Sequence, residues 1–175
     1  MSINQLETIG RRISPPRIPQ GISELARVTL EVALEQYGVR EDAGRPNRGP
    51  KVDEYVRGVS GRFGYLLGAS WCGRFAAWCC DTGAARLGAP SILPRDRDLA
   101  SGAKWLAWGD EAGLLVHASE PGTVAVLANG RGRYHVYFVV DTLLGEDLTV
   151  EGNSGDRVDC RARSALAPVG WIKIG

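Results

Sequence analysis

The first half of the chain carries apolar residues at the spacing of an α-helix. Ser23 is a favourable N-cap, an amphipathic stripe follows it, and Gly38 ends that stripe, which predicts a helix between these residues. A shorter stripe predicts a second helix from Val52 to Val59. The same spacing predicts a third helix from Ser70 to about Gly88 and a short fourth one within residues 99–109.

The period changes from helical to alternating at residue 123. Five short segments rich in β-branched and aromatic residues follow, separated by turns: 123–128, 134–141, 147–153, 157–160 and 169–174. Strands joined by short turns pair antiparallel, so we expect one antiparallel sheet. Helices in the first part and strands in the second make the predicted fold class α+β.

The length and composition fit one domain with a short N-terminal extension. The chain has 175 residues, of which 44% are hydrophobic and 23% charged, and this is enough to bury a core. Residues 1–20 contain three prolines and several arginines without periodicity, which predicts an extended, peripheral arm. We therefore expect residues 21–175 to form the single domain.

Charge and hydropathy argue against several classes of partner. The net charge of +1 gives no general field that would attract nucleic acid. No apolar run is long enough to span a bilayer, and the N-terminus lacks the apolar core of a signal peptide. We therefore expect no membrane insertion, and a protein of this kind that acts outside the cell would need a route other than a standard signal.

The four cysteines do not form the pattern of a disulfide framework, so free thiols are expected. Cys72 stands at the first turn of the helix predicted to begin near Ser70, in the sequence SWCGRFAAWCCD. Unpaired N–H groups and the positive end of the helix dipole stabilise a thiolate there, which favours Cys72 as a nucleophile. The alternative is a buried structural cysteine, which we expect for Cys79 and Cys80.

The predicted strands offer a base for Cys72. His135 opens the segment 134–141, and alternation places Glu151 and Asn153 together on one face of the next strand. A histidine base needs an acceptor for its second ring nitrogen, which Glu151 or Asn153 could supply from an adjacent strand. The alternative for either residue is a strand edge that turns into a loop.

Together these residues resemble the cysteine, histidine-dependent amidohydrolase/peptidase (CHAP) family. The order is Cys, His and then Glu-x-Asn, with the Cys after a Trp at a helix start and the His opening a strand. The resemblance covers most of the chain and rests on the motifs EQYGVRE, GRPNRGPKVDEYV, WCGRFAAWC, PGTVAVL, HVYFVV, EGN and VGWIKI. It implies a papain-like fold, related to the NlpC-type peptidases, with N-terminal helices packed on a C-terminal antiparallel sheet.

The resemblance also implies a cysteine hydrolase that cuts amide bonds in bacterial peptidoglycan. Cys72 would be the nucleophile, His135 the base, and Glu151 with Asn153 the orienting groups, with no metal or cofactor required. Cys72 would attack the carbonyl carbon, His135 would protonate the leaving amine, and water would release the acyl-enzyme. An N-acetylmuramoyl-L-alanine amidase and a peptide endopeptidase use the same groups, so the scissile bond in the stem peptide stays open.

One departure from the family pattern concerns the substrate groove. The family commonly has GHVG around its histidine, whereas this chain has RYHVYF, so Tyr134 and Tyr137 replace small residues. By alternation only Tyr137 shares the face of the histidine, and we expect it to contact the substrate. Trp71, Trp105 and Asn47 are the other expected groove residues, with the hydrophobic core as the alternative for Trp105.

Other function classes stay open at this point. A catalytically weak or inactive relative would serve as a cell-wall-binding or virion structural module. An active enzyme could be a phage lysin, an exported antibacterial effector or a wall remodeller, made in the cytoplasm and delivered to the periplasm or cell wall by a phage or a secretion device. A zinc enzyme is disfavoured, because the chain has neither a CxxC nor an HExxH motif and only two histidines, His135 and His117.

Overall fold

A seven-stranded sheet forms one side of the computed structural model, which describes residues 10–130 and 132–175. Its strands are β1 (Arg11–Arg12), β2 (Leu115–Val116), β3 (Thr123–Ala128), β4 (Tyr134–Leu143), β5 (Glu146–Glu151), β6 (Asp159–Ser164) and β7 (Gly170–Lys173). They lie in the order β1-β6-β5-β4-β3-β7-β2, with antiparallel pairing between neighbours. The predicted antiparallel sheet is confirmed.

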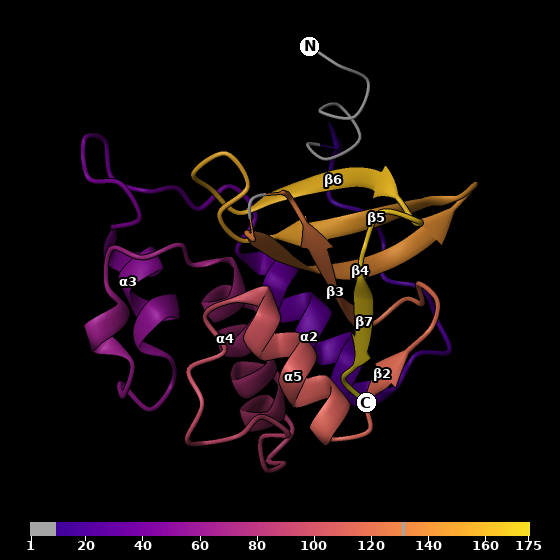
Figure 1. Ribbon diagram of the computed structural model, residues 1–175, viewed down its shortest axis with the longest axis horizontal. Helices are drawn as coiled ribbons and strands as arrows, with labels where there is room; N and C mark the ends of the chain where they lie inside the picture. Colours follow the sequence, from indigo (N-terminus) through magenta and orange to yellow (C-terminus); the bar gives the residue numbers. More distant parts are fainter. Residues whose placement is uncertain (1–9, 131) are drawn as a thin grey trace.

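Helices cover one face of this sheet. They are α2 (Glu24–Glu35), α3 (Pro50–Arg57), the short 3-10 helix η1 (Gly64–Leu66), α4 (Cys72–Arg86) and α5 (Gly102–Glu111). Figure 1 shows α2, α4 and α5 packed beneath the sheet, with α3 further out beside α4. Helices first and strands second give the α+β class that the sequence predicts.

Capping residues and glycines account for the helix boundaries. The hydroxyl of Ser23 caps α2, as expected, because it accepts a hydrogen bond from the N–H of Ala26 at 3.1 Å. The second helix ends at Arg57, two residues before the predicted end, because Gly58 adopts a φ of 71° that stops the helix. Val59 therefore lies outside the helix and is 59% exposed.

The main core lies between α4 and the sheet. Phe75 of α4 meets Phe138 of β4 edge to face, with ring centroids 6.5 Å apart, and Tyr55 of α3 packs on Phe75 at 5.2 Å. The opposite face of the sheet carries a smaller apolar cluster that includes Tyr137 and Trp171. This division agrees with the predicted alternation along β4, in which Phe138 and Tyr137 face opposite ways.

The strand prediction is wrong at β6. The segment 157–160 was expected, but the strand runs from Asp159 to Ser164 with the polar sequence DCRARS, and it pairs along the whole of β5. Its charged residues alternate onto the face away from the helices while Cys160 and Ala162 face inward. A strand of this kind forms without a run of apolar residues, so apolar runs in the sequence do not show its full length. The two-residue strand β2 is too short to show a pattern.

The N-terminal segment is attached to the sheet. Residues 1–9 of the predicted arm lie outside the described residues. Arg11 and Arg12 pair with Ala162 and Arg161 of β6, and Ile13 and Ile18 pack against the main core. The described part of the arm is therefore less peripheral than expected.

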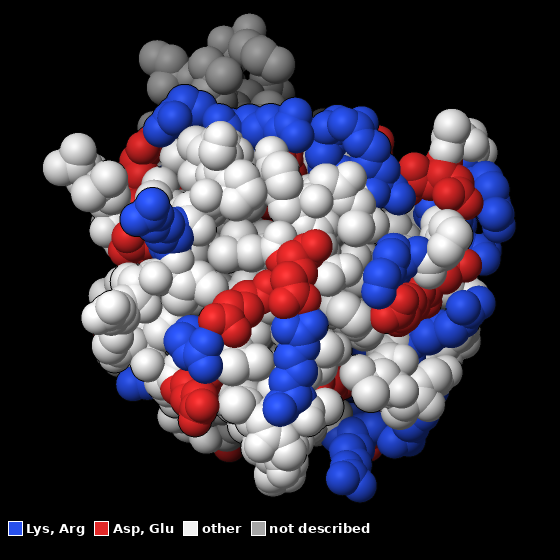
Figure 2. Space-filling view, turned by 180° about the vertical axis from the view of Figure 1, so that it is seen from behind, with Lys and Arg blue, Asp and Glu red and all other residues white. Residues whose placement is uncertain are grey.

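Within the described residues, none of the helices combines the length and the apolarity needed to cross a bilayer. Figure 2 shows the face turned away from the view of Figure 1, where acidic and basic side chains lie next to one another across the centre. This mixture fits the net charge of +1.

Candidate active site

Cys72 is the first residue of α4, directly after the N-cap Trp71. Its side chain is 3% exposed, and it interacts with the imidazole of His135, the backbone N–H of Val136 and the hydroxyl of Ser70, whose Oγ lies 3.9 Å from Sγ. A helix start leaves backbone N–H groups without acceptors inside the helix. The predicted position of Cys72 at a helix N-terminus is confirmed.

Gly73 allows another segment to approach this helix start. A Cβ atom at Gly73 would lie 2.5 Å from the carbonyl oxygen of Leu99 and 2.8 Å from that of Ala100. Any larger residue would push the connection that contains Leu99 away from the first turn of α4. The Cys-Gly sequence thus combines a thiol with the backbone space that its surroundings require.

Glu151 holds the ring of His135 from the neighbouring strand. His135 Nε2 lies 2.9 Å from Glu151 Oε2, and the same imidazole also interacts with the Cys72 thiol. Of the two predicted acceptors for the histidine, Glu151 is therefore the one that occupies this position. The predicted meeting of Cys72, His135 and Glu151 is present in the structure.

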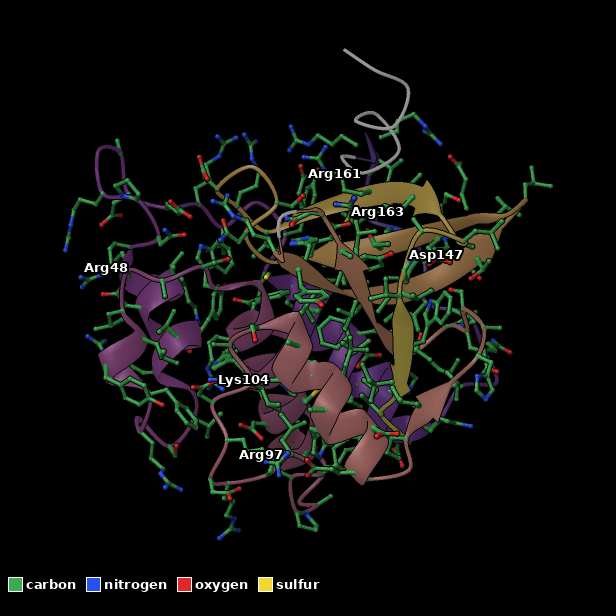
Figure 3. All side chains as sticks on the ribbon, in the orientation of Figure 1. Arg48, Arg97, Lys104, Asp147, Arg161 and Arg163 are labelled. Atoms are coloured by element: carbon green, nitrogen blue, oxygen red, sulfur yellow. The ribbon has the colours of Figure 1, made fainter. Side chains whose placement is uncertain are left out.

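Arg163 completes this arrangement and was not expected from the sequence. Its Nε donates to Glu151 Oε1 at 2.5 Å and its Nη2 to Oε2 at 2.7 Å, and both side chains are buried. Figure 3 labels Arg163 on β6, in the upper part of the sheet. The strand predicted from the sequence ends at residue 160, so Arg163 falls outside the predicted strand. The alternation of Arg161 and Arg163 on one face of a strand is the signal that could have found it.

These contacts move the pKa values of the thiol and the imidazole in opposite directions. Burial alone would raise the pKa of Cys72, but the contacts with His135, the Val136 N–H and Ser70 outweigh it and lower that pKa below its ordinary value. Burial opposes protonation of His135, yet its contacts with Cys72 and Glu151 raise its pKa to about 9. A thiolate and an imidazolium therefore coexist between the lowered pKa of Cys72 and the pKa of about 9 of His135.

Arg163 keeps Glu151 ionised in this buried place. Burial would raise the pKa of the carboxyl group, but the charge and hydrogen bonds of Arg163, and then those of His135, hold it well below its ordinary range. The carboxylate therefore remains an acceptor for the imidazolium across the neutral pH range.

Asn153 contacts different groups from those predicted. Its Nδ2 donates to Ser70 Oγ at 3.1 Å and to Asn47 Oδ1 at 3.2 Å. Its φ of 58° is tolerated by asparagine and turns the chain after β5 toward these partners. Asn153 thus connects the Asn47 loop to Ser70, the residue that approaches Cys72, while among the described contacts it is Glu151 that accepts from His135.

Three of the four predicted groove residues lie in the core instead. Tyr137 is buried on the outer face of the sheet, with Arg163 5.3 Å from its ring, and Trp71 and Trp105 have no exposed surface. The indole N–H groups of the tryptophans donate inward, to Glu41 at 2.8 Å and to the Gly73 carbonyl at 3.3 Å. The large aromatic area of these three side chains is buried, so substrate contact is the wrong assignment for them.

Asn47 lies beside the candidate site, and Tyr134 lies at the start of α5. Asn47 is half-buried and accepts from Asn153, which agrees with its expected place beside the site. Tyr134 is half-buried on the helix side of β4, where it packs against the start of α5 at Gly102. This agrees with the predicted orientation of Tyr134 away from the histidine.

The remaining cysteines and the second histidine take no part in this cluster. Cys79, Cys80 and Cys160 are buried free thiols, as expected, and burial raises their pKa values, that of Cys160 to about 12. His117 is exposed on the segment that follows β2. Across residues 10–130 and 132–175, no group of three or more His, Cys, Asp or Glu side chains is arranged to hold a metal ion.

Comparisons with known proteins add no relative to this picture: no family model, no curated protein and no solved structure matches the chain.

Proposed function

We propose that the protein is a cysteine-dependent amidohydrolase or peptidase. The observation that carries this proposal is the buried chain of contacts from the Cys72 thiol through His135 to Glu151, at the N-terminus of α4. A nucleophile, a base that contacts it and an acceptor that orients the base are the groups that acyl transfer requires. The lowered pKa of Cys72 and the raised pKa of His135 fit those roles.

In the proposed reaction the Cys72 thiolate attacks the carbonyl carbon of an amide. The imidazolium of His135 then donates its proton to the leaving amine, and neutral His135 takes a proton from the water that hydrolyses the thioester. The backbone N–H of Cys72 has no acceptor within its helix and would stabilise the oxyanion. The acyl group would approach from the side of Ser70, which is exposed whereas Cys72 is nearly buried.

The substrate we propose is bacterial peptidoglycan, cut as an amidase or an endopeptidase would cut it. The resemblance to the CHAP family supports this choice, and helices packed on one face of an antiparallel sheet are compatible with its papain-like fold. Asn47, Ser70 and Asn153 bring amide and hydroxyl groups to the accessible side of the thiol, where they can hydrogen-bond a stem peptide. A phage or a secretion device would deliver such an enzyme to the cell wall.

Digestion of purified peptidoglycan tests this function. Wild-type protein should release soluble fragments, and mass spectrometry of the new termini should identify one amide bond, whereas Cys72→Ala should release none. Folding of the variant is checked by circular dichroism. If the wild-type protein binds peptidoglycan without cleaving it, the protein is a cell-wall-binding module and not an enzyme. If it neither binds nor cleaves peptidoglycan, peptidoglycan is not its target.

A further inference from the structure

A cavity of about 490 Å³ lies on the flank of α4 opposite Cys72. Arg74, Ala77, Asp81 and Ala85 line it from the helix, and their spacing of three and four residues places them on one stripe. The connections at residues 59–63 and 89–99 form its other walls. Because neither Cys72, His135 nor Glu151 lines it, this cavity is separate from the candidate active site.

The walls of the cavity carry an excess of positive charge. Arg62, Arg74, Arg95 and Arg97 line it, with Asp81 as the single carboxylate in the lining. Asp81 accepts a hydrogen bond from Ser91, and Arg97 pairs with Glu111 outside the lining. Figure 3 shows Arg97 on the connection that runs below α4 and α5. Among the described residues, no carboxylate forms an ion pair with the other three arginines.

Arg74 is the buried cation of this cavity. It is 2% exposed; its Nε donates to the carbonyl of Val56 and its Nη1 to that of Asp98, while Nη2 has no hydrogen-bond partner among the described residues. Nη2 lies beside Gly58, next to the wall at residues 59–63, where a Cβ atom on Gly58 would come within 2.5 Å of it. The ring of Phe63 stacks on the guanidinium at 4.1 Å.

A buried cation without a carboxylate is costly, and an unpaired donor on it adds to that cost. Burial lowers the pKa of Arg74 to about 10, and the charges of Asp81 and Asp98 only partly oppose this lowering. The rest of the lining is mainly apolar, with Phe63, Leu93 and Leu99 among its side chains. The volume is in the range of sites for small organic molecules, roughly 300–1,000 Å³.

We propose that this cavity is a second binding site, for a small organic carboxylate with an apolar body. The carboxylate would face the guanidinium of Arg74 and the arginines at the mouth, while the apolar body would lie against Phe63, Leu93 and Leu99. A purely structural Arg74 would tie the two connections together through its carbonyl contacts alone, and it would then show no preference for an anion. This site does not depend on the proposed hydrolase activity, because binding is measured without turnover.

Isothermal titration calorimetry with paired probes tests the site. Hexanoate, benzoate and phenylbutyrate are each compared with their neutral amides, which keep the apolar body and lose the charge. At least one acid should bind wild-type protein about tenfold or more tightly than its amide, since a charged hydrogen bond in a desolvated site is worth roughly that factor. NMR amide shifts caused by that acid should map to residues 59–63, 74–85 and 89–99.

Arginine variants test whether the preference for the acid over its amide depends on the arginines of the cavity. Arg74→Gln should reduce the acid's advantage over its amide to less than about threefold, whereas Arg17→Gln, an exposed arginine outside the lining, should leave it unchanged. If Arg74→Gln fails to fold, the pair Arg62→Gln and Arg95→Gln, both exposed at the mouth, should weaken the acid and not the amide. Equal binding of all acids and amides, no saturable binding of any acid, or shifts that map elsewhere would each overturn the proposal.

Discussion

The two ends of the cysteine-bearing stretch of α4 differ in chemistry although both are buried. Cys72 at the helix start and Cys79 with Cys80 in the middle are all nearly inaccessible. Burial raises the pKa values of the two middle thiols, which have no cationic partner in hydrogen-bonding contact. The same burial acts on Cys72, but a histidine, a backbone N–H and a hydroxyl reverse the shift. Partners at the helix start therefore decide which thiol is reactive.

Removal of each thiol in turn should have the largest effect on activity at Cys72 and little effect at Cys79. Cys72→Ala should lower hydrolysis by about a thousandfold or more, because no other group can form the acyl-enzyme. Cys79→Ala should keep activity and lose about 1 kcal/mol of unfolding free energy to a cavity. Iodoacetamide should label Cys72 first, as read by peptide mapping. Preferential labelling of Cys79 or Cys80, or full activity in Cys72→Ala, would contradict the assignment.

The second expected effect concerns the buried carboxylate behind the histidine. Glu151→Gln should lower turnover by about a hundredfold, because the imidazolium loses its charged acceptor. Glu151 raises the pKa of His135, so its removal should move the alkaline limb of the activity profile below about pH 9. Full pH–rate profiles of both proteins check the sign of this shift.

This substitution also breaks the buried ion pair between Glu151 and Arg163, and breaking such a pair costs about 3–5 kcal/mol. The double variant Glu151→Gln with Arg163→Met removes both charges and separates stability from chemistry. Its unfolding midpoint in urea should recover relative to the single variant, while its alkaline limb stays displaced. Recovery of wild-type turnover in the double variant would show that Glu151 acts only through folding.

Asn153 is expected to have a smaller effect, and on a different quantity. Asn153→Ala removes the contacts with Ser70 and Asn47, and it should lower turnover by roughly three- to tenfold. The alkaline limb should not move, since no hydrogen bond joins Asn153 to His135 among the described contacts. Asn47→Ala, which removes only one of the two contacts, is the matched control. A displaced alkaline limb in Asn153→Ala would show that Asn153 acts on His135, as expected from the sequence.

The sequence predicts the helices and the helix-start cysteine because these depend on local signals. Ser23 caps α2 through its own side chain, and Gly38 and Gly58 end the helical segments of α2 and α3 through their positive φ angles. These signals do not depend on what packs against the helices. The alternation along β4 likewise assigns His135 and Phe138 to opposite faces without knowledge of the partner strands.

Strand pairing and the burial of individual side chains depend on the assembled fold, so the sequence alone predicts them less well. The polar strand β6 exists because β5 pairs with it, so Arg163 beside Glu151 could not be read from an apolar pattern. The burial of Tyr137 arises because the outer face of the sheet is itself packed, which alternation alone does not reveal. The role of Asn153 depends on two loops from distant parts of the chain, near Asn47 and Ser70.

The smallest effect is expected at Ser70, the weakest of the partners that distinguish Cys72 from Cys79. The hydroxyl of Ser70, 3.9 Å from Sγ, is one of the contacts that lower the pKa of Cys72. Ser70→Ala should therefore raise that pKa and move the acid limb of the activity profile to higher pH.

The alkaline limb near pH 9 should stay in place, since Ser70 is not among the groups that raise the pKa of His135. Turnover at the optimum should change by less than about twofold, because the base and its acceptor are untouched. Ser60→Ala, an exposed serine on the connection after α3, is the matched control. Thiolate absorbance at 240 nm, followed against pH with Cys72→Ala as the blank, measures the shift without substrate. An acid limb that moves to lower pH, or a titration unchanged from wild type, would show that Ser70 does not stabilise the thiolate and that His135 with the Val136 N–H suffices to separate Cys72 from the thiols in the middle of α4.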